Sequence, residues 1–170
     1  MNESKKVEFS FVPGKWEEKI INLSENAYWK ENLYRLRIDP IKTYSKNQLF
    51  YIEYIAFFKN IETANSYGGL TLEQSQLNEK SIINDNVLIT FDINSIIKNI
   101  TFKSNVSLGY KDKSLRVTSL DSPSQFGFFS NKYRKFLLNN YPVVKIKYFS
   151  HTKDIPMYIY YDTVESPGLR

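Results

Sequence analysis

Short segments in which apolar and polar residues alternate recur along the chain, and this pattern constrains the fold more than any other feature. In residues 5–12, apolar side chains alternate with Lys6, Glu8 and Ser10. Strict alternation places the apolar side chains on one face of a half-buried strand. Residues 15–23, after a Pro-Gly turn, are predicted to be extended in the same way. The chain therefore begins with two strands.

Further strand-like segments follow the first two, separated by polar turns. They are residues 33–39, 49–58, 87–93, 100–110, 114–120, 126–129, 143–150 and 157–163. The aromatic fraction of 16%, mostly Tyr and Phe, also favours strands. Segments 59–69 and 131–139 are each predicted to form a short helix or turn. Many short strands with polar turns are typical of an all-β sandwich or barrel, and 170 residues are enough for one such domain.

The stretch "YRLRID" at 34–39 sets charges inside an apolar strand. Tyr34 and the two aliphatic residues that follow it point one way by parity, while Arg35, Arg37 and Asp39 point the other way. An acid set beside arginines in a strand is more simply a charge-paired structural group than a general acid. We interpret Arg37 and Asp39 as a structural pair.

Residue content excludes several enzyme classes. The chain has no cysteine, and His151 is its only histidine, so thiol chemistry, histidine-based triads and multi-histidine zinc sites are not expected. No P-loop or dinucleotide-binding pattern is present. Glu53 and Asp39 are the acids set in apolar strands, and charge pairing explains them better than glycoside hydrolysis does. The sequence predicts a protein that is not an enzyme.

Two further acids, Asp92 and Asp121, fall at predicted strand ends or turns. Their oxygens suit turn capping, and a structural calcium ion remains an open alternative because calcium binds such oxygens. No other cofactor is indicated.

The net charge of +5 is spread along the chain, and its densest cluster is "NKYRK" at 131–135. Dispersed lysines are typical of a solvated surface, so no nucleic-acid partner is expected. No segment has the length of apolar sequence that a membrane span or a signal peptide needs, so neither is predicted in this chain. If the protein works outside the cell, its export signal must lie on a longer parent.

Aromatic side chains in predicted loops are the best candidates for ligand contact, because loops carry binding function more often than the strands that support them. With the turn acid, the candidate ligand-binding residues are Tyr44, Tyr110, Asp121, Phe129 and Tyr133.

The first part of the chain resembles a known family. The run "FSFVPGKWEEKIINLSENAYWKENLYRLRIDPI…LFYIEYIAFF" is similar to the C-terminal half of bacterial carbohydrate-binding modules that have a galactose-binding-like jelly-roll fold. The residues that carry this resemblance are Pro13, Gly14, Trp16, Trp29, Leu36, Arg37, Asp39, Pro40, Ile52 and Ile55. The resemblance implies that Trp16, Trp29, Arg37 and Asp39 belong to the structural frame.

The last part, "KSLRVTSLDSPSQFGFFS…LLNNYPVVKIKYFSHTKDIPMYIYYDT", looks like the N-terminal half of the same module. Two positions depart from the family pattern. Lys113 stands where a glycine is usual, and Asp121-Ser122-Pro123 replaces an Asp-Pro turn. These departures leave the loop geometry at 121–129, and any ligand contact there, uncertain.

Taken together, the two halves stand in reversed order. Residues 1–66 resemble the C-terminal half, 67–86 would form a linker, and 87–170 resemble the N-terminal half. The chain is either a circular permutant or a piece of a tandem array, and both alternatives predict one sandwich in which strands 7–12 and 157–163 lie near each other.

The resemblance implies non-catalytic carbohydrate binding by an accessory module of a longer multidomain protein, outside the cell or at its surface. The alternative is a structural or assembly sandwich of a bacterial surface or phage protein that binds no sugar. The same fold hosts many functions, so the fold alone does not decide between them.

Overall fold

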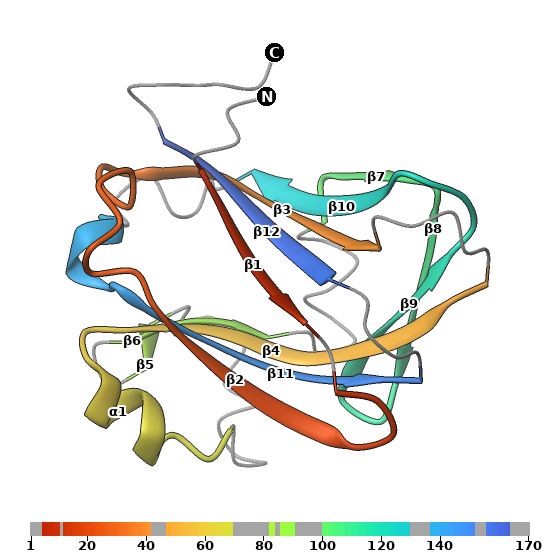
Figure 1. The fold of residues 1–170 in the computed structure, drawn as a ribbon, viewed down its shortest axis with the longest axis horizontal. Coiled ribbons are helices and arrows are strands. Elements are labelled where there is room, and N and C mark those ends of the chain that lie inside the picture. Colours follow the sequence, from red (N-terminus) through yellow and green to blue (C-terminus); the bar gives the residue numbers. More distant parts are fainter. Residues whose placement is uncertain are drawn as a thin grey trace.

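The structure, a computed structural model, confirms the all-β prediction. It describes residues 5–10, 12–41, 47–69, 82–83, 86–90, 100–129, 137–151 and 156–163. Over these residues the chain forms two antiparallel sheets that face each other as a sandwich (Figure 1).

The first sheet has five strands among the described residues. Its order is β1 (Lys6–Ser10), β12 (Pro156–Thr163), β3 (Leu33–Ile41), β10 (Ser124–Phe129) and β7 (Phe102–Ser104). We call it the five-stranded sheet.

The second sheet has seven strands among the described residues. Its order is β2 (Trp16–Asn22), β11 (Val143–Ser150), β4 (Leu49–Phe58), β6 (Asn86–Thr90) and β5 (Ile82–Ile83). The first half of β4 pairs instead with β9 (Ser114–Ser119), and β9 pairs with β8 (Val106–Lys111). We call it the seven-stranded sheet.

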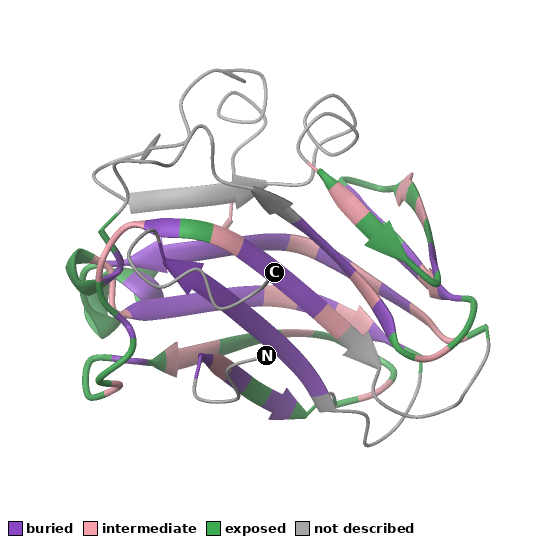
Figure 2. Ribbon diagram, turned by 90° about the horizontal axis from the view of Figure 1, so that it is seen from above, coloured by how far each residue is buried: buried purple, intermediate pink, exposed green. Residues whose placement is uncertain are grey.

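The main hydrophobic core lies between the sheets. Buried residues, purple in Figure 2, make up much of the central strands. Leu36 and Ile38 of β3 enter it from one side, and Ile52, Val117 and Ile146 enter it from the other. These residues come from both halves of the sequence, so the halves share one core.

Strands β1 and β12 are direct neighbours, with Lys6 opposite Tyr160 and Phe9 opposite Met157. The expectation that the first and last strands lie side by side is confirmed. Circular permutation and a tandem array both fit this pairing, so the origin of the reversed order stays a prediction.

A short helical element lies in the described part of each predicted helical segment. Helix α1 (Ile61–Ser66) begins at Asn60, whose side chain accepts a hydrogen bond from the Thr63 backbone N–H at 2.9 Å. A 3₁₀ turn, η1 (Leu138–Asn140), follows the polar residues of the second segment. Most of the predicted linker 67–86 lies outside the described residues, but β5 and the first residue of β6 fall within it.

Two details of the predicted strands are wrong. Residues 100–110 are not one strand. Asn105 has φ 53°, a left-handed conformation that asparagine tolerates, and it separates β7 in one sheet from β8 in the other. Tyr34 does not share the buried face of β3. It lies at a bulge where Asp162 and Thr163 pair with Arg35 and Leu33, and it is exposed.

Candidate functional site

Of the residues predicted to bind ligand, the structure describes Tyr110, Asp121 and the backbone of Phe129. Tyr110 lies in strand β8 rather than in a loop, and it packs against the main core. Asp121 is exposed and accepts a hydrogen bond from the Ser122 backbone N–H at 2.8 Å. Phe129 ends strand β10. Tyr44 and Tyr133 lie outside the described residues.

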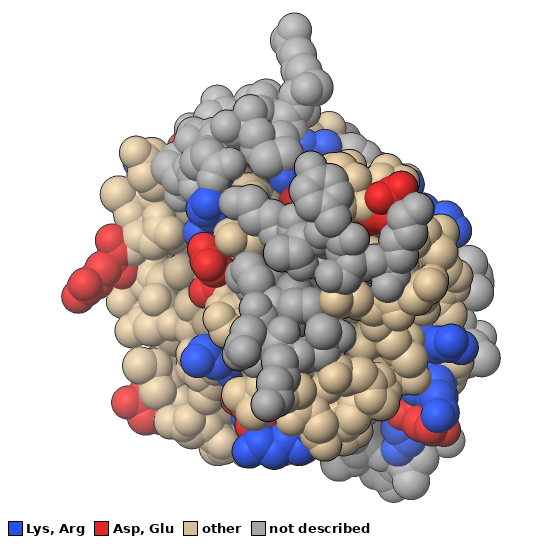
Figure 3. Space-filling model, turned by 45° about the vertical axis from the view of Figure 1, so that its right-hand side comes forward, with Lys and Arg blue, Asp and Glu red and all other residues tan. Residues whose placement is uncertain are grey.

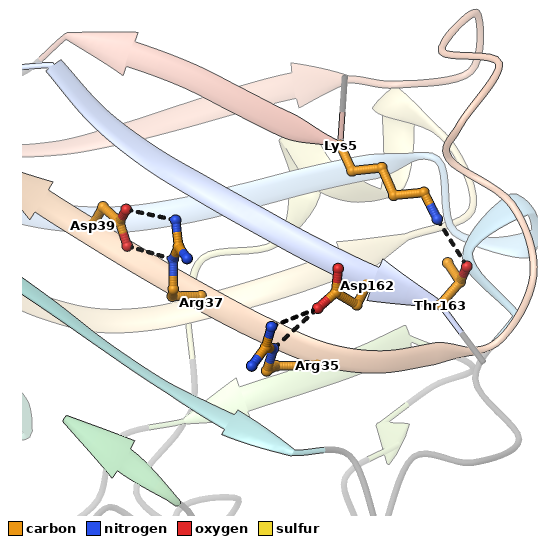
Figure 4. A network of polar contacts seen from close by, with 6 residues as sticks. All are labelled: Lys5, Arg35, Arg37, Asp39, Asp162 and Thr163. Carbon is orange, nitrogen blue, oxygen red and sulfur yellow. Dashed lines mark hydrogen bonds and ion pairs between the residues drawn. The ribbon is translucent and has the colours of Figure 1, made fainter. Parts of the chain in front are cut away.

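The charged residues of β3 form ion pairs on the outer face of the five-stranded sheet (Figure 4). The Arg37 guanidinium holds the Asp39 carboxylate with two hydrogen bonds, of 2.8 and 2.9 Å. The Arg35 Nε and Nη2 atoms both contact one oxygen of Asp162 of β12, Oδ2, at 3.0 and 2.9 Å. The predicted pairing of Arg37 with Asp39 is therefore present.

Strand register explains this arrangement. Asp162 stands opposite Arg35, and Tyr160 stands opposite Arg37. The Arg37 guanidinium carbon lies 4.1 Å from the centre of the Tyr160 ring, a cation–π contact. Burial raises the pKa of both Asp39 and Asp162, and the adjacent guanidinium groups oppose that rise. Both carboxylates are thus occupied by arginines, which suits a brace between strands better than a reacting group.

Close packing beside the brace depends on Gly127 of β10. A Cβ placed there would overlap the Leu36 carbonyl oxygen and would lie 2.6 Å from the Phe102 ring. The Phe102 ring therefore covers this glycine, and it lies 5.7 Å from the Arg35 guanidinium. Only a residue without a side chain fits this position.

The outer face of the seven-stranded sheet carries a different arrangement. Trp16 of β2 stands opposite Phe149 of β11, and Phe149 stands opposite Tyr51 of β4. Tyr51 in turn stands opposite Arg116 of β9, which stands opposite Gly109 of β8. We call Trp16, Phe149, Tyr51 and Arg116 the aromatic row, because they form one line across four neighbouring strands.

Alternation directs these side chains outward. In β11, Ile146 and Tyr148 belong to the core, so Phe149 projects to the other face. Leu115 and Val117 are likewise buried on either side of Arg116 in β9. Each row member therefore occupies the solvent-facing parity of its strand.

The rings of the row touch. The Trp16 and Phe149 centroids are 5.8 Å apart at an interplanar angle of 51°, and those of Tyr51 and Phe149 are 6.1 Å apart at 63°. His151, just after β11, lies 4.8 Å from Phe149 at 77°. Trp16 is 43% exposed, although the family resemblance implied a frame residue. Trp16 and His151 are exposed, whereas Phe149 and Tyr51 are partly buried, so the rings form an apolar surface that is partly open to solvent.

Polar groups border this surface. Lys147 Nζ forms an ion pair with Glu53 Oε2 at 2.7 Å and lies 5.9 Å from the centre of the Trp16 ring. Glu53 reaches this face because it is the extra residue of a bulge in β4. Within the described part of the chain, Arg116 and the Tyr51 hydroxyl have no hydrogen-bond or ion-pair partner. The row therefore offers unused donors beside apolar rings.

Helix α1 covers the other end of the same face (Figure 1). Tyr54, Ala56 and Phe58 pack there with Ala64 of the helix, so both faces of this part of β4 are buried. Lys145 lies beneath the helix, 2% exposed, and donates to the carbonyls of Ala64 and Tyr67 at 2.9 and 2.6 Å. The helix does not extend over the part of this face where the aromatic row lies.

Glu18 of β2 also contacts Lys145. Its carboxylate pairs with Lys145 Nζ at 2.9 Å and accepts a hydrogen bond from the Tyr54 hydroxyl at 2.8 Å. Burial acts to raise the pKa of Glu18, but the contacts with Lys145 and Tyr54 outweigh it, so that pKa is lowered. Burial raises the pKa of Tyr54, and its bond to Glu18 adds to that rise. This cluster fastens the helix to the sheet.

Among the described residues, no group of three or more potential ligand side chains could hold a metal ion. Asp92, one of the two acids considered for calcium, lies outside them. No helix in the described part of the chain is long and apolar enough to cross a membrane. On the face drawn in Figure 3, the cationic and anionic side chains of the described residues are interspersed.

Compared with known protein families, curated proteins and solved structures, the chain shows no significant match. The resemblance of its two halves to carbohydrate-binding modules therefore remains a prediction.

Sequence reasoning did not single out Phe149, Tyr51 or Arg116. The usable signal was parity: Phe149 follows Lys145 and Lys147 on the polar parity of an otherwise alternating strand. An aromatic residue on a solvent-facing parity is a candidate contact residue.

Proposed function

We propose that this domain is a non-catalytic carbohydrate-binding module, and that the aromatic row on the seven-stranded sheet is its ligand-contact surface. The observation that carries the proposal is the exposed ring of Trp16, which is in contact with Phe149 and Lys147 of the neighbouring strand. Indole and phenol rings offer flat, amphipathic surface to the apolar faces of sugars at a low cost in side-chain entropy.

The polar groups beside the rings suit the other part of a sugar. The Tyr51 hydroxyl, the His151 imidazole and the Arg116 guanidinium can donate or accept hydrogen bonds at the edges of the row. Because these groups stand on or next to paired strands, they are held in place before a ligand arrives.

The acids of the five-stranded sheet are held in ion pairs, which favours a binding role over a catalytic role for the domain. Asp39 and Asp162 are each held by an arginine, so neither is presented as a general acid or nucleophile. In this proposal the module has a jelly-roll fold of the galactose-binding-like type. It acts outside the cell or at its surface, as one part of a longer protein.

The test is a glycan-array screen of the purified domain, with and without calcium, followed by acrylamide quenching of tryptophan fluorescence. Trp29 is 3% exposed and Trp16 is 43% exposed, so quenching reports mainly on Trp16. A bound glycan should protect Trp16 from acrylamide. A folded domain that binds no soluble or insoluble polysaccharide would instead favour a structural or assembly sandwich.

A further inference from the structure

Arg116 gives the aromatic row a charge that its own neighbours do not neutralise. The guanidinium is exposed and has no ion-pair partner among the described residues. Its cross-strand neighbours on the same face are Tyr51 on one side and Gly109 on the other, and neither carries a charge. The end of the row is therefore cationic.

Two other cations near the rings are already paired with acids. Lys147 pairs with Glu53 at 2.7 Å, and Lys15 pairs with Glu17 at 2.8 Å. Each of these pairs contributes no net charge to the row. Among the described members of the row, Arg116 is thus the cation that no acid neutralises, and exposed Lys111, two residues after Gly109 on the same face of β8, adds to the positive charge at this end.

The space beside Arg116 is open. A Cβ built on Gly109 would have no atom within 4 Å, so the position opposite Arg116 in β8 is open and carries no side chain. An anionic group can reach the guanidinium from that side or from above Tyr51 without displacing a side chain.

We propose that the glycan bound by this row contains uronic acid, with a sugar carboxylate held by Arg116 while the ring of that sugar rests on Tyr51. This inference rests on the proposed function and names its substrate class. The planar guanidinium fork matches the two oxygens of a carboxylate, and such bidentate pairs are the stronger kind of charge-assisted hydrogen bond.

The spacing of the strands fits this assignment. Neighbouring strands lie about 4.8 Å apart, so Arg116 stands one strand from Tyr51 and about 14 Å from Trp16. A carboxylate at the edge of a sugar stacked on Tyr51 therefore lies within reach of Arg116. The remaining length of the row accommodates further sugars, which favours an acidic polysaccharide over a free sugar.

The experiment measures binding of the whole domain to polygalacturonate, to neutral galactan and to dextran sulfate by isothermal titration calorimetry. The variants are Arg116→Gln, Arg116→Lys and, as a matched control, Lys103→Gln, which removes an exposed charge from β7 of the other sheet. All the replaced side chains are exposed, and melting curves verify that each variant is folded.

The expected result is preferential binding of polygalacturonate, weakened at least tenfold by Arg116→Gln and unchanged by Lys103→Gln. Arg116→Lys should bind polygalacturonate more tightly than Arg116→Gln but more weakly than the wild type, because an ammonium group cannot form the bidentate pair. Added salt should weaken the interaction.

Four results would overturn the inference. Galactan bound as tightly as polygalacturonate, or an Arg116→Gln variant that equals the wild type, would remove the carboxylate contact while leaving the proposed function in place. Preference for dextran sulfate would assign the arginine to a sulfate group instead. Binding to none of the three, together with silence on the glycan array, would overturn the proposed function as well.

Discussion

Tyr51 and Arg116 stand directly opposite each other on neighbouring antiparallel strands, and both project from the outer face of the seven-stranded sheet. This pairing joins an aromatic ring to a cationic group at a separation fixed by the ladder of backbone hydrogen bonds. A contact surface built on strands in this way is held more rigidly than one built on loops.

The two tryptophans predict opposite responses to substitution. Trp16→Ala should weaken glycan binding at least tenfold with little effect on the melting temperature, because the ring is 43% exposed. Trp29→Phe should lower stability by roughly 1–3 kcal/mol without affecting binding, because it leaves a buried cavity and removes the indole hydrogen bond to the Tyr141 carbonyl. Titration calorimetry and thermal unfolding measure the two effects separately. The reverse pattern would place the binding site elsewhere.

We predict that breaking the Arg37–Asp39 ion pair lowers the stability of the fold. Arg37→Ala should destabilise the fold by roughly 3 kcal/mol, because it leaves the Asp39 carboxylate half-buried without its partner. Removing both charges in the double variant Arg37→Met, Asp39→Asn should lower the free energy of unfolding by less than Arg37→Ala alone does. Urea unfolding of the variants measures the difference. Unchanged stability combined with lost ligand binding in Arg37→Ala would show that this pair contacts ligand.

Gly127 and Gly109 provide a matched pair of glycines in strands. Gly127→Ala should destabilise the protein by about 3 kcal/mol or prevent folding, because the new methyl group meets backbone atoms of β3 and the Phe102 ring. Gly109→Ala should change stability by no more than about 0.5 kcal/mol, since the space around it is open. Expression yield and thermal melting compare the two variants. Equal melting temperatures would contradict the close contact at Gly127.

Glu18 predicts a pH-dependent contribution to stability. Its pKa is lower in the folded protein than its ordinary value of 4.5, so its stabilising effect is present above that value and is lost as the pH falls through the folded pKa. Glu18→Gln should therefore be less stable than the wild type at neutral pH, and the difference should shrink below about pH 4.5. Chemical unfolding at a series of pH values measures this. A difference that stays constant down to strongly acidic pH would exclude the ionised carboxylate as the source.

The alternation of the sequence was sufficient to predict the sandwich and most of its strands, because period-two patterning sets which face of each strand is buried. It also predicted the Arg37–Asp39 pair, whose members are two residues apart on one strand face. Local pattern could not predict the aromatic row, since its four members come from strands far apart in sequence and meet only through cross-strand register.

Backbone conformation accounts for the remaining differences. Asn105 bends the chain between the two sheets. The bulge at Glu53 turns an additional side chain of β4 outward. Neither feature is marked by a break in the alternation of apolar and polar residues in the sequence. Lys113, which replaces a usual glycine of the family pattern, has φ 67° and follows Asp112 at φ 49°. The turn between β8 and β9 therefore keeps a left-handed geometry that glycine adopts with less strain.

Nuclear magnetic resonance mapping of a polygalacturonate oligosaccharide onto the isotope-labelled domain tests the central claim most directly. If the aromatic row binds the glycan, chemical-shift changes should centre on Trp16, Tyr51, Arg116 and Phe149, with the outer face of the five-stranded sheet unaffected. Changes centred on Tyr44 and Tyr133, or on the brace formed by Arg35 and Arg37, would contradict this proposal.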